Sequence, residues 1–169
     1  MQFEQKTLSK IQWNPFDMIG KQWYLLTAGG LSDYNTMTAS WGFMGEMWGK
    51  SFLCGVRTNR HTLPFMEQND CFSVSFFEES QRAALQFCGT HSGRDYDKAK
   101  ETGLTPVELD GVATFAEAKL VLICKKQYTD MLKPEGFLIP ETYQRWYNTD
   151  PLHKLFVGEI LAAYERTDA

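Results

Sequence analysis

The residues best suited to chemistry lie close together in the segment VRTNRHT, residues 56–62. The segment offers two guanidinium groups, two hydroxyls and an amide, from Arg57, Arg60, Thr58, Thr62 and Asn59. A helix is predicted to begin at its end, with Thr62 as the N-cap and Pro64 in the first turn. Guanidinium groups and helix N-termini both bind anions, and phosphate is the common biological anion. Because residues 47–66 include no Asp or Glu, the segment predicts a phosphate site.

A second polar segment, NTMTASWG at residues 35–42, precedes the basic one. It alternates small polar with larger side chains, as a half-buried strand does. It carries hydroxyls and backbone groups but no side chain that would act alone as an acid or base. A backbone ribbon beside the face of Trp41 suits a flat ring with polar edges. A ring site followed by a phosphate site predicts one nucleotide-like cofactor bound along the chain.

Short strands are predicted to position both segments. The apolar patterns predict strands at residues 23–28, 35–41, 52–57, 71–77, 112–115, 118–128 and 155–164. Helices are predicted at residues 62–68, at 80–89 and just before Gly103, with a loop at 43–50. Residues 1–20 are predicted to be an extended lead-in. Residues 131–151, with three prolines, are predicted to be an excursion from the sheet that contains a short helix, ETYQRWY at 141–147. This pattern favours a small β-barrel or sandwich with peripheral helices, formed by one domain over residues 1–169.

The composition argues against several classes of function. The net charge is −4, whereas a nucleic-acid-binding protein presents a strongly basic surface. No apolar leader and no apolar run of transmembrane length is visible, so we expect a cytoplasmic protein that does not bind membranes. The four cysteines form no CxxC pair and are expected to be reduced core residues. Cys88 and His91 have a zinc-like spacing, but no second ligand pair follows, so no metal site is expected.

Five segments in order resemble a known family. NTMTASWG, RTNRHT, CFSVSFF, GTHSGRDYDK and HKLFVGEIL are similar to segments of the flavin reductase-like proteins, including the flavoredoxin-type branch. The resemblance covers roughly residues 23–161, which is nearly the whole chain. It implies a mainly β, FMN-binding split β-barrel with a few peripheral short helices. It also implies a homodimer, with FMN bound near the subunit interface.

The resemblance assigns roles to individual residues. The strand that contains Asn35, Met37, Thr38, Ala39, Ser40 and Trp41 resembles the part of the family that faces the isoalloxazine edge. Arg57, Thr58, Asn59, Arg60 and Thr62 resemble the ribityl-phosphate grip, and Ser92, Gly93 and Lys98 a loop that borders the flavin. His153 resembles a family position on the nicotinamide or substrate side and is the candidate catalytic residue.

Each of these residues also has a purely structural interpretation. A tryptophan is more often a core residue than a ligand, and we expect that for Trp48 but not for Trp41. Lys98 is equally well explained as an exposed helix residue paired with Asp95 or Glu101. A single histidine such as His153 is usually structural or exposed. The nearby acidic residues are explained by helix capping, for which Asp95 is the candidate.

The leading hypothesis is an FMN-containing oxidoreductase that passes electrons from NADH or NADPH to flavin or to a partner acceptor. One alternative is a flavoredoxin-like electron carrier, which has no nicotinamide site of its own and serves a redox protein partner. Another is a flavin-free split barrel that acts as a ligand-binding or dimerisation module. Residues 131–151 depart from a plain short reductase, and they either cap the active site or lengthen the dimer interface.

Overall fold

The computed structural model describes residues 2–12 and 14–167. The strands are β1 (Phe3–Lys6), β2 (Tyr24–Gly30), β3 (Asp33–Ala39), β4 (Gly42–Glu46), β5 (Lys50–Arg57), β6 (Cys71–Phe76), β7 (Pro106–Leu109), β8 (Val112–Phe115), β9 (Leu120–Met131) and β10 (His153–Arg166). The α-helices are α1 (Pro15–Asp17), α2 (Thr62–Gln68), α3 (Arg82–Thr90), α4 (Lys98–Thr102) and α5 (Pro140–Tyr147). Short 3₁₀ helices lie at Leu8–Lys10, Glu79–Gln81 and Pro134–Gly136, and a π-helical turn at Met18–Gln22.

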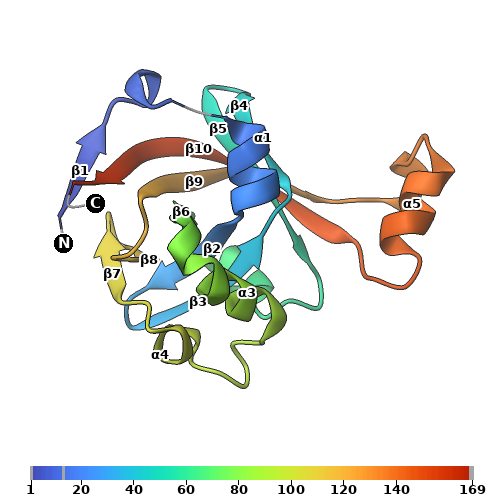
Figure 1. Ribbon diagram of the computed structural model, residues 1–169. Helices are drawn as coiled ribbons and strands as arrows, with labels where there is room; N and C mark the ends of the chain where they lie inside the picture. The colour runs from blue at the N-terminus through green and yellow to red at the C-terminus, as the bar shows by residue number, and fades with distance from the viewer. Residues whose placement is uncertain (1, 13, 168–169) are drawn as a thin grey trace.

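Eight strands form one antiparallel sheet, in the order β3-β2-β6-β9-β10-β5-β4, with β1 added beside β10 (Figure 1). The two end strands of this path, β3 and β4, are joined by only two residues, Ser40 and Trp41. The sheet must therefore curl until its ends approach each other, and the Tyr24 hydroxyl of β2 donates to the Trp41 carbonyl at 2.7 Å across this junction. The result is the predicted split β-barrel.

The side chains of β9 show how the sheet is buried on both faces. Leu120, Leu122 and Cys124 belong to a core that also contains Phe72 and Phe156. The intervening residues, 121 and 123, belong to a second core, beneath α3 and the β7–β8 hairpin. Because successive strand residues point to opposite faces, a continuous apolar run is what a doubly covered strand requires.

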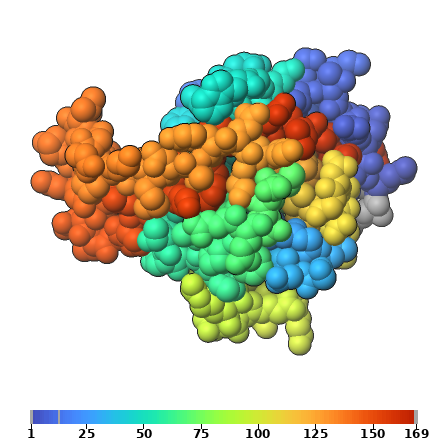
Figure 2. Space-filling view, turned by 180° about the vertical axis from the view of Figure 1, so that it is seen from behind, coloured from blue at the N-terminus to red at the C-terminus, as the bar shows by residue number. Residues whose placement is uncertain are grey.

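Residues 131–151, here called the arm, leave the barrel between β9 and β10. Figures 1 and 2 show the arm standing off the barrel as a separate lobe that carries α5. The predicted short helix within this segment is confirmed. Leu138 and Ile139, which directly precede α5, are 94% and 62% exposed.

Several local predictions were wrong. Most of the predicted 43–50 loop is strand, β4 and the start of β5, and Trp48 at its tip is 67% exposed rather than a core residue. Thr62 is the first helical residue rather than the N-cap, and the cap of α4 is Asp97 rather than Asp95. The predicted extended lead-in contains short helical turns.

No helix within residues 2–12 and 14–167 combines the length and the apolar character needed to cross a lipid bilayer.

Candidate functional site

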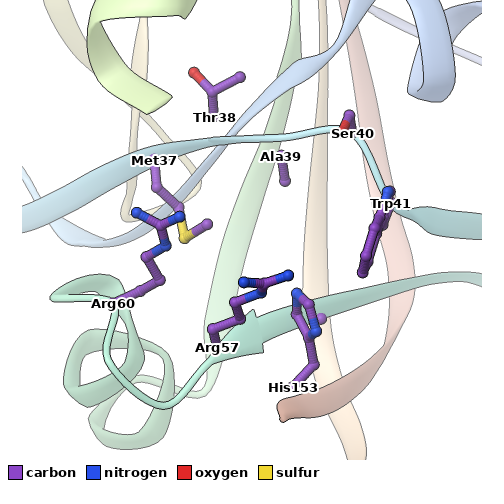
Figure 3. Close-up of a pocket in the computed structure, with 9 residues that line it drawn as sticks. Met37, Thr38, Ala39, Ser40, Trp41, Arg57, Arg60 and His153 are labelled. Carbon is purple, nitrogen blue, oxygen red and sulfur yellow. The ribbon is translucent and has the colours of Figure 1, made fainter. Parts of the chain in front are cut away.

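A cavity of about 240 Å³ opens where the end of β3 faces β5 and β10 (Figure 3). It is lined by Met37, Thr38, Ala39, Ser40, Trp41, Gly55, Arg57, Arg60 and His153. The register of β5 against β10 places His153 opposite Arg57, and the curl of the sheet brings Trp41 over both. Three segments that are distant in sequence therefore meet at one site.

The β3 strand presents its backbone to this cavity. Figure 3 shows the side chains of Met37 and Ala39 pointing toward Arg57 and His153, and that of Thr38 pointing away. The Thr38 hydroxyl donates instead to the Leu85 carbonyl of α3. Among the described strands β3 pairs only with β2, so alternate residues direct their N–H and C=O groups off the sheet edge. The Thr36 carbonyl is one of the groups directed off the edge, because it accepts from the Lys98 ammonium of the neighbouring helix at 2.8 Å. Thr38 lies two residues further along the strand, so its backbone groups are directed the same way.

A second cavity adjoins the first and shares Met37 and Arg60 with it. Its other lining residues are Asn35, Asn59, His61, Thr62, Cys88, Gly89, Thr90, His91, Ser92, Gly93, Arg94 and Lys98. With Arg60, the lining of this cavity includes three cationic side chains and, among the described residues, no Asp or Glu. Burial, and then the cations Arg94 and Lys98, lower the pKa of His61 although Asp33 and Asp95 oppose them. The second cavity is thus a basic pocket suited to an anion.

Lys98 is the buried member of this basic pocket, with 7% of its surface exposed. Its ammonium donates to the carbonyls of Thr36 and Cys88, both at 2.8 Å. Burial lowers the pKa of Lys98. An ammonium has three N–H donors, so one remains after these two bonds. The predicted surface pairing with Asp95 or Glu101 is absent from the described contacts of this buried side chain.

Asn35, Thr62 and Gly93 form the wall between β3, α2 and the 91–97 loop. The Asn35 amide donates to the Thr62 hydroxyl at 2.8 Å, and both side chains are buried. A Cβ atom at Gly93 would collide with the Asn35 side-chain oxygen. The loop lies against β3 because residue 93 has no side chain.

Arg57 is held by the arm. Its guanidinium lies 2.6 Å from the Asp150 carboxylate and donates to the Trp146 carbonyl at 3.4 Å. The Arg57 side chain is only 16% exposed. One of the two predicted phosphate-binding arginines is therefore already paired with an acid, which the sequence around residue 57 did not indicate.

His153 is held from the same side. Its Nδ1 lies 2.9 Å from the Tyr147 hydroxyl, and its ring lies 5.1 Å from that of Trp41. Burial lowers the pKa of His153 to about 4, and the charges of Arg57 and Arg60 contribute. The imidazole is therefore neutral at physiological pH.

All but one of the predicted site residues line one of the two cavities. The exception is Thr58, which is exposed and lines neither. The prediction missed Gly55, His61, Arg94 and the α3 end, Cys88–His91. His61 and Arg94 lie inside the quoted motifs, so the basic character of RTNRHT and HSGRD was a usable signal for both.

The comparisons with known proteins agree on one family. The family described as "Flavin reductase like domain" matches residues 17–169. An FMN-binding domain of a flavin reductase-like enzyme from Shewanella baltica has a TM-score of 0.69 and 19% identity, covering 98% of this chain and 78% of that one. Flavoredoxin from Methanosarcina acetivorans has a TM-score of 0.65 and 25% identity, covering 94% and 76%.

An NADH:FAD oxidoreductase from Streptomyces globisporus, in complex with NAD and FAD fragments, has a TM-score of 0.64 and 19% identity, covering 87% of this chain and 76% of that one. No protein among the curated sequences matches this chain.

Proposed function

The chain belongs to the flavin reductase-like family, and on that premise we propose that it is an FMN-binding oxidoreductase that takes electrons from NADH or NADPH. The observation that carries the proposal is the pair of adjoining cavities. One has a backbone edge and an aromatic wall, and the other is basic and free of lining acids. FMN has a flat ring with polar edges at one end and a phosphate at the other, which matches this division.

The residues divide between the two ends of the cofactor. The outward backbone groups at Thr38, with Ala39, Ser40 and Trp41, would border the isoalloxazine. Arg60 would bind the phosphate together with Lys98, because both line the basic pocket and neither forms an ion pair with an acid among the described residues. Arg57 would border the ring rather than the phosphate, because Asp150 already neutralises it.

Bound flavin would accept a hydride and deliver electrons, so the protein need supply only binding, orientation and electrostatics. Within the described residues, no three His, Cys, Asp or Glu side chains form a group suited to a metal ion. His153 is the candidate catalytic residue, a neutral imidazole at the ring end.

A flavoredoxin-like electron carrier is the second candidate, favoured by the 25% identity with the Methanosarcina flavoredoxin. The two functions differ in the reaction of FMN-loaded protein with NADH and NADPH in the absence of air, followed by visible absorption. Rapid bleaching by either nucleotide supports the reductase. A yellow protein that neither nucleotide bleaches supports the carrier, and a protein that takes up no FMN supports the flavin-free module.

We also propose that residues 1–169 form one domain and that the protein is located in the cytoplasm. Two copies of the chain are proposed to form a homodimer. Support for the dimer comes from a group of exposed apolar side chains on the β4–β5 hairpin and beside it. Phe43, Met47 and Trp48 are 73%, 49% and 67% exposed, and the Trp48 ring lies 6.2 Å from that of Tyr128. Exposed apolar groups of this kind mark interaction surfaces.

A further inference from the structure

The arm contacts two polar side chains that line the first cavity, Arg57 through Asp150 and His153 through Tyr147. We propose that Tyr147 is a positioning residue, whose hydroxyl holds the His153 ring so that its Nε2–H is presented to the cavity. The proposal deepens the proposed function, because the group that would receive this hydrogen bond is the polar edge of the flavin ring or of the second substrate.

Neighbouring groups confine the His153 ring. The hydrogen bond at its Nδ1 therefore decides which nitrogen carries the proton that faces the cavity. Trp41 lies on one side at 5.1 Å, and Gly55 lies so close that a Cβ there would be 3.2 Å from the ring. Tyr147 is itself fixed, since only 8% of it is exposed and the Phe137 and Tyr143 rings lie 5.5 and 6.2 Å away. Figure 3 shows the imidazole standing between Arg57 and Trp41.

The chemistry of the pair fixes the position of the proton. A neutral imidazole has one N–H donor and one acceptor nitrogen, and the hydrogen bond at one nitrogen determines the state of the other. A phenol is a stronger acid than a neutral imidazole N–H, so the Tyr147 hydroxyl donates and Nδ1 accepts. The proton of the ring then resides on Nε2, which forms no hydrogen bond with any of the described residues. Arg57 and Arg60 face the ring as cations and disfavour a second proton, which Asp150 alone would favour.

The ion pair between Asp150 and Arg57 keeps Tyr147 within reach of His153. The arm otherwise projects from the barrel (Figure 2), so its position depends on contacts at its base. These contacts include the 2.6 Å ion pair, the bond from Arg57 to the Trp146 carbonyl, and the edge-to-face contact of Trp146 with Trp41 at 5.0 Å. The arm is thus fastened beside the residue that it orients.

The first test uses FMN-free protein labelled with ¹⁵N at histidine. Its imidazole nitrogen shifts report the tautomer of each of the three histidines, with His153→Gln assigning one of them. We expect His153 in the wild type to carry its proton on Nε2, and Tyr147→Phe to give a mixture of tautomers. Tyr143→Phe, from the same helix, is the control and should leave the spectrum unchanged. A wild-type proton on Nδ1, or an unchanged His153 in Tyr147→Phe, overturns the proposal whether or not the protein binds FMN.

The second test uses the FMN-loaded protein with the nicotinamide nucleotide that reduces it. Loss of one positioning hydrogen bond should lower kcat in Tyr147→Phe by roughly 3- to 10-fold. KM and the FMN dissociation constant should stay within about twofold, because the basic pocket is unchanged. A fall in FMN affinity of more than tenfold with unchanged kcat would show a structural role and overturn the proposal. If neither nucleotide reduces the flavin, the proposed function fails, and the tautomer measurement still decides the role of Tyr147.

Discussion

Lys98 is a buried residue that lines the basic pocket and also stabilises the fold. Its ammonium joins the backbone of β3 to the end of α3 through the Thr36 and Cys88 carbonyls. Lys98→Met keeps an unbranched side chain that is one atom shorter, but leaves both carbonyls without this donor. We expect a loss of about 1–3 kcal/mol in the free energy of unfolding, measured by urea denaturation. Lys100→Met, at an exposed position of the same helix, is the control, and equal effects of the two substitutions would contradict the assignment.

His153 makes the stability depend on pH. Its pKa is about 4 in the folded protein against 6.5 as its ordinary value. Between these values the unfolded chain binds a proton that the folded chain does not, so the stability from neutral His153 is complete above about pH 6.5 and is lost as the pH falls toward 4. We expect His153→Gln to show a smaller loss of stability than the wild type over this interval, followed by thermal unfolding. Parallel curves for the two proteins would contradict the low pKa.

For individual residues, the sequence indicated which side chains line the cavities but not which partners they contact. The motifs around Arg57, Arg60 and Lys98 predicted most of the lining of the cavities. The pairing of Arg57 with Asp150 was not predictable, because the two residues are brought together by the arm. Thr62 has the residue type of a helix cap, but its hydroxyl accepts from Asn35, a tertiary contact that overrides the local preference.

Among the elements, Gly158 in β10 marks a place where the sheet is closely packed. A Cβ there would lie 2.7 Å from the Phe72 ring and 3.0 Å from the Cys124 Cβ. The register of β10 against β9 shifts between Val157 and Gly158, and a glycine inside a strand often marks such a bulge or a close approach. Gly158→Ala should lower the free energy of unfolding by about 1–3 kcal/mol through overpacking, measured by thermal denaturation.

Gly45→Ala is the matched control for this substitution. Gly45 also lies in a strand, β4, but a Cβ there meets nothing within 4 Å. If Gly158→Ala were as stable as Gly45→Ala, the close contact between β10 and the Phe72 ring would be refuted.

Most strands were predictable because their apolar periodicity is strong. The strands β2 and β6 are buried almost throughout, β9 is buried over its first five residues, and β5 is buried mostly at alternate positions. Three described strands were not among the predicted ones, β1, β4 and β7. The Gly- and Met-rich sequence of β4 reads as a loop, and the residues of β4 are mostly exposed. Its pairing with β5 comes from the hairpin and from the curl of the sheet, neither of which leaves a periodic signal.

For the whole molecule, the family resemblance predicted what periodicity alone did not. Alternation indicates strands but not their order, and a barrel and a sandwich remained equally compatible with it. The order β3-β2-β6-β9-β10-β5-β4 joins strands from both ends of the chain. This long-range order places His153 opposite Arg57 and so creates what we propose as the ring end of the site.

The proposed homodimer is also tested with the whole molecule. If the hairpin surface around Phe43 is the interface, Phe43→Glu should place a charge in it and convert a dimer to a monomer. Light scattering coupled to size-exclusion chromatography measures this mass directly. Glu46→Ala, at an exposed position of the same strand, is a control that should remain dimeric. A monomeric wild type at micromolar concentration would contradict the dimer.

The central claim is that the two cavities form one FMN site, with the phosphate at the basic end. The most direct measurement is the dissociation constant of FMN and of riboflavin, which lacks the phosphate, for the wild type, Arg60→Ala and the exposed-cation control Lys125→Ala. We predict that the wild type and Lys125→Ala bind FMN much more tightly than riboflavin. Arg60→Ala should lose roughly tenfold or more in FMN affinity, as expected for the loss of a charge-assisted bond, while its riboflavin affinity stays unchanged. A wild type that binds FMN no better than riboflavin, or an Arg60→Ala protein that weakens both ligands equally, would contradict the account.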